Sequence, residues 1–401
     1  MANRVVITGL GMVTPAGLGK EPFFQSLASG KSTIVRPSLS LPKDGMDVAA
    51  EVRGFNIEDF IGRKFARFMD RASSFCHVAS RLALEDARIN MEKINTDNIA
   101  VSIGTFLGSV HWGEPEYNRF YENPGADVHR FAAIIGYFGN LIGNVTIPLG
   151  IHGRSQVFLN SDVASCDAIG YGYECIQRGK TSISLAGGTE APVTPGIFYL
   201  FNSVEMLAKN PEFPERATRP FDLHRNGFAL GEGAWMLVLE DLDHALKRDA
   251  PIYAEIIGYS TSCHGNIASA MENVLRSADV RPEAVEYISA NGLATVAEDP
   301  RETRAIKRVF GDAAKKIPVS SIKSMFGHPL GAAGSMQAAS CAFVLQKGVI
   351  PPTINLDTPD PDCDLDFVPN APRRQAVDVV LQNTISLTGK NSALLYRRLP
   401  E

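Results

Sequence analysis

Short apolar runs alternate with longer amphipathic stretches along almost the whole chain of 401 residues. The runs with strand character are residues 5–7, 99–103, 157–159, 182–186, 234–239, 254–257, 285–288 and 319–322. Between them, apolar residues recur at helical spacing in residues 68–89, 162–178, 266–278, 300–310 and 330–346. Apolar runs joined through helices are typical of buried strands in βαβ units. The pattern therefore predicts an α/β fold with buried, largely parallel sheets.

The same alternation indicates a duplication. In each half of the chain, a strand ends in small or polar residues and opens into a long helix, first at Ser161 and Asp162 and later at Gly327 and His328. A charged helical segment followed by a new strand separates the halves near residue 250. We therefore expect two similar α/β halves, residues 1–250 and 251–401.

Composition argues against several classes of protein. A net charge of −5 without a dense stripe of Lys and Arg argues against nucleic acid as a partner. The longest apolar runs are far shorter than the roughly 20 residues of a membrane-spanning helix. The six cysteines are scattered, with no CxxC pair and no His at metal spacing, which predicts free thiols and no metal site. We expect no signal peptide and a soluble, cytoplasmic protein.

The junction at Asp162 is the most informative candidate site. The helix dipole and free amides at such a turn stabilise a reactive thiolate, yet this chain has a carboxylate there. Asp162 is either a catalytic carboxylate or a cap that accepts hydrogen bonds from its own helix, and we favour the cap. Cys166, one turn later, is better explained as a small buried hydrophobe than as a displaced nucleophile.

Several motifs occur together, in order, over essentially the whole chain. They are Val-Val-Ile-Thr-Gly-Leu-Gly-Met-Val-Thr-Pro at 5–15, Ala-Gly-Gly-Thr-Glu at 186–190, Arg-Pro-Phe-Asp at 219–222, Arg-Asn-Gly-Phe at 225–228, Gly-Glu-Gly-Ala at 231–234, Lys-Ser-Met-Phe-Gly-His-Pro-Leu-Gly-Ala-Ala-Gly at 323–334 and Pro-Pro-Thr-Ile-Asn-Leu at 351–356. With these motifs the chain resembles the β-ketoacyl-acyl carrier protein synthases of the thiolase superfamily. The resemblance implies a thiolase-like α/β fold with buried mixed sheets in an αβαβα arrangement.

The family's reaction is a decarboxylative condensation in which a cysteine carries the acyl group and two histidines assist. By this resemblance, Asp162 stands at the cysteine and Asn291 at the first histidine. The second histidine is kept as His328, together with the family's Lys323 and Glu302. A carboxylate is a weak nucleophile and repels a malonyl carboxylate, so we expect no condensation by this chain alone. We interpret the three retained residues as a buried polar cluster that still needs its hydrogen bonds.

The family's glycine-rich oxyanion and gating loop, Gly-Phe-Gly-Gly-Thr-Asn, is also altered. In this chain it reads Ser386, Leu387, Thr388, Gly389, Lys390 and Asn391. Together with Asp162 and Asn291, this loop makes a third change at the positions that carry the family's chemistry.

Inactive relatives with such losses include the chain-length factors of type II polyketide synthases, which pair with an active ketosynthase. In that class the interface residues set the length of the growing polyketide, and the usual replacement for cysteine is Gln, so Asp162 departs from it. Candidate tunnel residues, weighed against ordinary core aromatics, are Phe106, His111, Trp112, Tyr137 and Phe138.

The resemblance thus implies a heterodimer with an active ketosynthase, which would use malonyl and acyl groups on the phosphopantetheine arm of an acyl carrier protein. No cofactor of its own is implied. Two alternatives remain open: a stand-alone malonyl-carrier-protein decarboxylase or acyltransferase that uses Asp162, and a structural homodimeric scaffold.

Overall fold

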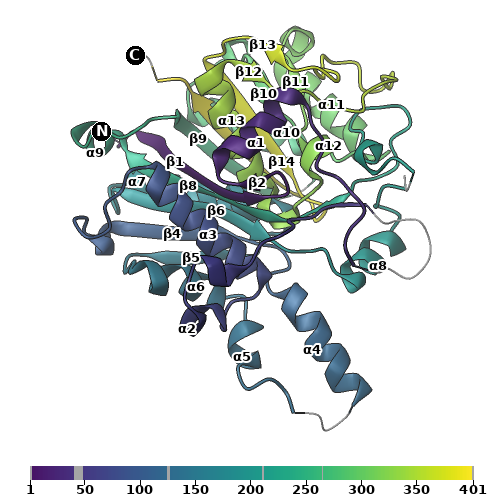
Figure 1. Ribbon diagram of the computed structural model, residues 1–401. Helices are drawn as coiled ribbons and strands as arrows, with labels where there is room; N and C mark the ends of the chain where they lie inside the picture. The colour runs from purple at the N-terminus through teal and green to yellow at the C-terminus, as the bar shows by residue number, and fades with distance from the viewer. Residues whose placement is uncertain (1, 40–47, 124–126, 210–211, 264, 400–401) are drawn as a thin grey trace.

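The computed structural model describes residues 2–39, 48–123, 127–209, 212–263 and 265–399 (Figure 1). In these ranges, one mixed sheet of eleven strands has the order β11-β10-β14-β15-β9-β1-β8-β6-β4-β5, with β2 paired to β1. Five strands of this path come from the first part of the chain, here in sequence order: β1 Val5–Thr14, β4 Ile99–Gly104, β5 Ser155–Phe158, β6 Ile183–Glu190 and β8 Gly233–Asp241. The later five are β9 Ala254–Cys263, β10 Tyr287–Ser289, β11 Val319–Ser320, β14 Val379–Ile385 and β15 Lys390–Arg397.

The two groups of five strands share one topology. In each group, numbered in chain order, the strands lie side by side as third, second, fourth, fifth and first. The second strand is parallel to the third and the fourth, and the fifth is antiparallel to the fourth and the first. Antiparallel pairing of β1 with β9 joins the groups. The expected similarity of two α/β halves is therefore present in the strand order.

The expectation of largely parallel sheets is wrong, because the sheet is mixed. In each group the fourth and fifth strands pair antiparallel, and in the second group they form a tight hairpin from β14 to β15. The strand before Asp162 is also not buried as predicted. Since β5 pairs only with β4 at the sheet edge, Ser155 and Gln156 are exposed in the chain alone.

Helices form three layers around the two halves of the sheet. Helix α3 (Arg71–Asp86) packs on β1, β8 and β6, and α10 (Ile267–Ser277) packs on β9 and β15 on the other side of the molecule. Helices α7 (Ala164–Gln177) and α13 (Ala333–Lys347) contact each other and both groups of strands. The layers therefore run αβαβα, with α7 and α13 at the centre.

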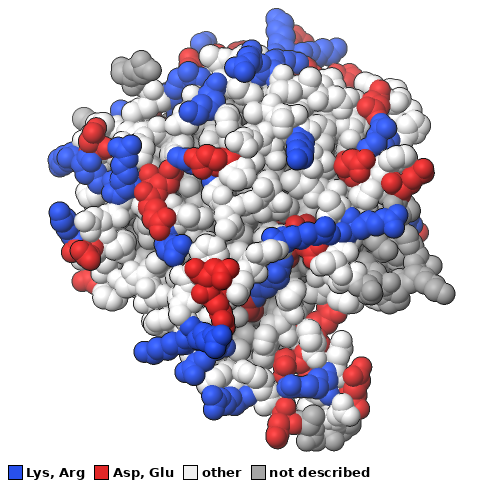
Figure 2. Space-filling model, viewed as in Figure 1, with Lys and Arg blue, Asp and Glu red and all other residues white. Residues whose placement is uncertain are grey.

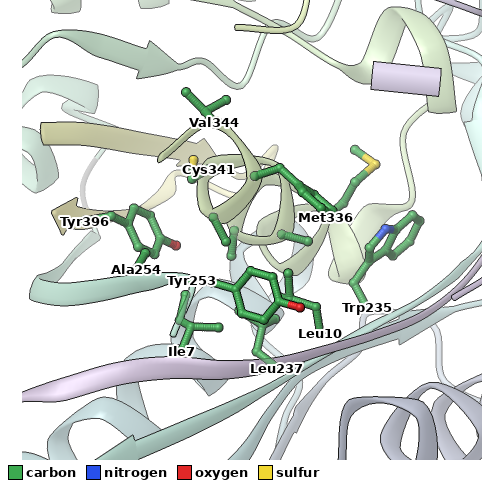
Figure 3. Close-up of a cluster of buried hydrophobic side chains, with 14 of the residues drawn as sticks. Ile7, Leu10, Trp235, Leu237, Tyr253, Ala254, Met336, Cys341, Val344 and Tyr396 are labelled. Carbon is green, nitrogen blue, oxygen red and sulfur yellow. The ribbon is translucent and has the colours of Figure 1, made fainter. Parts of the chain in front are cut away.

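The core is centred on α13, in which every residue from 333 to 345 is buried. A helix that is apolar or small on all sides is typical of a central position in a larger protein. Figure 3 shows side chains of β1, β8 and α13 meeting there, among them Leu10, Leu237 and Met336. This core fixes the N-terminal ends of α7 and α13, where the candidate site lies.

The five predicted helices are all present, with changed ends. They are α3, α7, α10, α11 (Glu298–Phe310) and α13, and short 3-10 turns at Ser161–Val163 and Leu330–Ala332 precede α7 and α13. The other helices are α1 Lys20–Ser29, α2 Arg63–Ala66, α4 Val110–Glu122, α5 Ala132–Ile135, α6 Asn140–Leu149, α8 Pro195–Ser203, α9 Leu242–Lys247 and α12 Lys323–Phe326. The short strands are β2 Gly17–Leu18, β3 Ala49–Ala50, β7 Leu230–Gly231, β12 Val349–Ile350 and β13 Arg373–Arg374.

Two helices project from this layered body. Figure 1 shows α4 and α5 extending away from the sheet, and no residue of α4 is buried. Figure 2 shows basic and acidic side chains interspersed over the described part of the same face. We call α4 and α5 the projecting arm.

Candidate functional site

The site begins at a sharp turn between β5 and α7. Ser161 has a φ of 58°, a left-handed conformation that is uncommon for a residue with a side chain. One 3-10 turn, Ser161–Val163, then leads into α7 at Ala164. This turn directs Asp162 inward, where its exposed fraction is 0%.

The Asp162 carboxylate bonds to distant segments of the chain. Its Oδ1 accepts a hydrogen bond from Nε2 of His328 at 2.9 Å. Its Oδ2 accepts from the backbone N–H of Leu387 and from Oγ of Ser161, both at 3.0 Å. The prediction that Asp162 caps its own helix is wrong, because Val163 is the N-cap residue of α7 and no side chain caps that helix.

These donors keep Asp162 ionised. Burial raises the pKa of Asp162, but the hydrogen bond from His328, with those from Leu387 and Ser161, outweighs burial and lowers the pKa to about 2. Burial also lowers the pKa of His328, against the opposing effect of Asp162. The pair is therefore a buried carboxylate that accepts a hydrogen bond from Nε2 of His328. Among the described residues, Nδ1 of His328 has no hydrogen-bond partner.

A second buried cluster joins the other predicted site residues. Nζ of Lys323 donates to the backbone oxygen of Asn291 at 2.6 Å and to its Oδ1 at 2.9 Å. Glu302 accepts from the backbone N–H groups of Asn291 and Gly292, each at 2.8 Å, and from Nδ2 of Asn383 at 2.7 Å. Burial lowers the pKa of Lys323 to about 8, against the opposing charges of Glu302 and Asp162. Lys323 and Glu302 thus meet at Asn291, whereas His328, the third residue of the predicted polar cluster, bonds to Asp162 instead.

The altered loop closes the hairpin between β14 and β15. Its turn is held by a hydrogen bond from the Ser386 N–H to the Lys390 oxygen at 2.8 Å and by one from the Thr388 N–H to Oγ of Ser386 at 3.1 Å. Leu387 points its backbone N–H at Asp162 and packs its side chain into an apolar cluster. That cluster surrounds the site and includes Phe106, Phe201, Phe228, Leu293 and Leu330. The loop therefore forms a wall of the site rather than an open entrance.

All the residues that correspond to the family's catalytic set are inaccessible to water. The exposed fractions are 0% for Asp162, 1% for His328 and 2% for Asn291. The Phe228 ring meets the His328 imidazole edge to face at a centroid distance of 5.0 Å. A thioester could not reach His328 without movement of these neighbours.

Four of the five tunnel candidates line one cavity. Phe106, Trp112, Tyr137 and Phe138 surround a space of about 1040 Å³ beside the projecting arm and the start of α8. Tyr137 and Phe138 are 66% and 40% exposed, so the alternative that they are ordinary core aromatics is wrong. His111 instead lines a separate polar pocket of about 410 Å³ with Arg71 and Glu232, and burial lowers its pKa.

One glycine allows an aromatic ring to sit at this cavity. Gly108 has a φ of +54°, and a Cβ at this position would overlap the Phe138 ring. Since Phe138 lies directly over the Gly108 backbone, any larger residue would displace the ring. The absence of a side chain at Gly108 therefore fixes the position of Phe138 in the cavity wall.

Glu190 has a role that the sequence analysis missed. Its fully buried carboxylate accepts hydrogen bonds from the N–H groups of Phe106 at 2.7 Å, Leu107 at 3.0 Å and Gly331 at 3.1 Å. It also accepts one from Oγ1 of Thr105 at 3.2 Å. Glu190 therefore ties the cavity wall to the segment that follows His328. An acidic residue at the end of an apolar strand was the available signal.

Family models account for most of the chain. The model described as beta-ketoacyl synthase, N-terminal domain, matches residues 2–245, and the model described as beta-ketoacyl synthase, C-terminal domain, matches residues 253–357. The chain belongs to the beta-ketoacyl synthase family.

Similar proteins match this chain end to end. The chain is 37% identical to a 3-oxoacyl-[acyl-carrier-protein] synthase 2 of Coxiella burnetii, with 99% of each chain covered. It is 36% identical to the tetracenomycin polyketide synthase ketoacyl synthase alpha subunit of Streptomyces glaucescens, over 100% of this chain and 98% of that one. The solved ishigamide ketosynthase/chain length factor is 31% identical, with a TM-score of 0.94 and all of both chains covered.

These likenesses confirm the expected thiolase-like α/β fold with a mixed sheet. Among the described residues, no group of three or more His, Cys, Asp or Glu side chains could hold a metal ion. None of the described helices has the length and apolar character needed to cross a bilayer. The six cysteines are free, and Cys166 is fully buried as predicted.

Proposed function

We propose that this beta-ketoacyl synthase is a chain-length-factor subunit of a type II polyketide synthase. One observation carries the proposal: the residue at the predicted nucleophile position, Asp162, is a buried carboxylate already engaged by His328 and Leu387. Neither donor is free to stabilise a thioester oxygen, and no thiol stands at the turn. The subunit would act by shaping the reaction of a partner that keeps the cysteine and both histidines.

The projecting arm supports a large protein partner. Tyr117, Phe120 and Tyr121 on α4 and Tyr137 beside α5 are 67%, 45%, 75% and 66% exposed. A contiguous aromatic surface of this kind marks an interaction site on a folded protein. Strand β5 leaves one edge of the sheet unpaired close to Leu159, which is also exposed. We assign this surface to an active ketosynthase, because the cavity beside it suits a growing acyl chain.

The cavity of about 1040 Å³ is the proposed place where product length is set. Its walls are mostly aromatic and aliphatic, so an apolar chain would be bound by burial rather than by specific hydrogen bonds. The substrates would be acyl and malonyl groups on the phosphopantetheine arm of an acyl carrier protein, the carrier named for the Coxiella burnetii relative. Bulk at Trp112, Tyr137 or Phe138 would then limit the chain.

The alternative of a decarboxylase or acyltransferase that uses Asp162 is less well supported. An ionised carboxylate with three hydrogen bonds is a poor nucleophile, and the malonyl carboxylate would approach a buried negative charge. No observation favours the homodimeric scaffold over a heterodimer, and the same experiment separates the two.

Co-expression tests the proposal. The chain is produced alone and together with a ketosynthase that has an intact cysteine and two histidines and is encoded beside it. We expect a stable one-to-one complex that elongates malonyl units on acyl carrier protein, and no elongation by either subunit alone. A homodimer indifferent to the ketosynthase would support the scaffold instead. Turnover of malonyl carrier protein by the chain alone, lost in Asp162→Asn, would support the decarboxylase.

A further inference from the structure

The loop of residues 386–389 is held from within the site by a single carboxylate. The two oxygens of Asp162 take different donors: Oδ1 takes the imidazole of His328, and Oδ2 takes the backbone N–H of Leu387. All three residues belong to segments that are distant in the chain. Asp162 is therefore the bridge between the α7 turn, the segment before α13 and the β14–β15 loop.

A second set of bonds holds the far end of the same loop. Nζ of Lys390 donates to Oδ1 of Asn160 at 3.3 Å, and Nδ2 of Asn160 donates to Oδ2 of Asp167 at 2.7 Å. Oγ of Ser392 and the hydroxyl of Tyr259 both donate to Oδ1 of Asp167, at 2.5 and 2.9 Å. These bonds fix the start of β15, but none of them reaches Leu387. At the inner end of the loop, the Leu387 N–H bonds to Asp162, beside the turn's own bonds at Ser386 and Thr388.

The chemistry of the inner contact favours an anion. Nε2–H of His328 and the N–H of Leu387 are buried donors that converge on one carboxylate, and buried donors without an acceptor are costly. A carboxylate offers an acceptor oxygen to each donor. An amide at the same position has one acceptor oxygen, and its NH2 group would face the second donor. A thioester carbonyl likewise has a single acceptor oxygen, whereas Asp162 offers one oxygen to each of the two donors.

We propose that Asp162 is a positioning residue, an internal anion that occupies the donors of His328 and Leu387 and holds residues 386–389 closed over the site. The Leu387 side chain is then kept in the apolar cluster with Phe228 and Leu293. While the loop is closed, an incoming thioester can neither reach the site nor bond to the donors of His328 and Leu387. This inference goes beyond the proposed function, since it concerns this chain alone and holds whichever partner it binds.

The test is hydrogen–deuterium exchange of the full chain, measured by mass spectrometry on short peptides covering residues 383–391. In Asp162→Gly, we expect amides of residues 386–389 to exchange about ten- to a hundredfold faster, the effect of losing a charge-assisted hydrogen bond. Sodium formate, which supplies the missing carboxylate, should restore slow exchange, and sodium chloride at equal ionic strength should not. Cys166→Ala, which creates a small cavity on the same helix, is the control. The amides of this loop should then exchange at the wild-type rate.

Unchanged exchange of residues 386–389 in Asp162→Gly would overturn the proposal, as would restoration by chloride as efficient as restoration by formate. If Asp162→Gly exchanges rapidly throughout the chain because it fails to fold, Asp162→Asn takes its place. That nearly isosteric variant keeps one acceptor, and we expect faster exchange confined to the loop. A wild-type rate at Leu387 in Asp162→Asn would equally overturn the assignment. If the chain fails to form a complex with a ketosynthase, that result bears on the proposed function and not on the positioning role of Asp162.

Discussion

The α7 turn and the projecting arm both place side chains in environments unusual for their type. The turn buries ionisable groups, and the arm exposes aromatic ones. The turn places ionisable groups, Asp162 and His328, where water cannot reach them, and supplies the Asp162 carboxylate with internal donors. The arm leaves tyrosine and phenylalanine side chains largely exposed to water. Removing one partner of a buried charged pair destabilises a protein, whereas a large exposed aromatic surface marks an interaction site. Under the proposed function, the role of this chain lies at the exposed surface of the arm.

The largest effect on folding is expected at Glu302. Glu302→Ala removes the acceptor for the N–H groups of Asn291 and Gly292 and leaves Lys323 without its nearest buried counter-charge. We expect a loss of about 3–5 kcal/mol, the cost of breaking a buried charged network. Thermal unfolding would measure it, with Glu302→Gln as the control that keeps one acceptor. A loss below about 1 kcal/mol would mean that the buried side of the comparison is not held by its polar pairs.

Acid should weaken the turn through Asp162. The folded-state pKa of Asp162 is about 2, below the ordinary value of 3.8, so its contribution is present above pH 3.8 and is lost as the pH falls toward 2. The contribution is about 2 kcal/mol. Unfolding free energies of the wild type and of Asp162→Asn should therefore differ at pH 6 and converge near pH 2. A constant difference across this range would contradict an ionised Asp162.

On the arm, substitutions should affect association and not folding. Tyr117→Ala with Tyr121→Ala should change the unfolding free energy of the chain alone by less than about 0.5 kcal/mol, because both rings are exposed. The same pair should weaken the complex with the ketosynthase by about ten- to a hundredfold, measured by titration calorimetry. Leu246→Ala, an exposed apolar residue on α9, is the matched control and should leave affinity unchanged. Equal affinities for all three proteins would remove the arm from the interface.

Trp112→Ala is expected to change the product of the complex more than the stability of the chain. Trp112→Ala enlarges the cavity that Trp112 shares with Phe138 and should cost little stability, since Trp112 is only partly buried. The product distribution of the reconstituted complex should shift toward longer chains, as read by mass spectrometry of the released products. His111→Ala, outside this cavity, serves as the comparison. An unchanged distribution would show that Trp112 does not line the tunnel.

The sequence predicted the fold class because its apolar runs follow the buried strands. It missed β14 and β15, since these strands carry buried polar residues, among them Gln382, Asn383, Thr384 and Ser392. Those side chains bond to Glu302, Gln337 and Asp167 across the core, and no periodic apolar pattern marks them. The hairpin of these two strands accounts for antiparallel pairing in the second group only, since β6 and β8 pair antiparallel in the first group.

The sequence predicted which residues belong to the site but not which of them contact one another. Asp162, Asn291, Glu302, Lys323 and His328 were named from motifs, and the structure brings them together in two adjoining clusters. The hydrogen bonds of Asp162 join residues 166 and 225 positions away, so local helix-capping rules could not find them. The exposure of Tyr137 and Phe138 was likewise unpredictable, because the sequence alone does not distinguish an aromatic residue in a core from one at an interface.

Intact-protein mass spectrometry of the complex tests the central claim most directly. The chain and its ketosynthase partner are incubated together with acyl and malonyl carrier protein, quenched and weighed separately. We predict an acyl adduct on the ketosynthase and an unchanged mass for this chain, because Asp162 is ionised, buried and fully engaged. An acyl adduct on this chain that disappears in Asp162→Asn would contradict the account and make Asp162 a nucleophile.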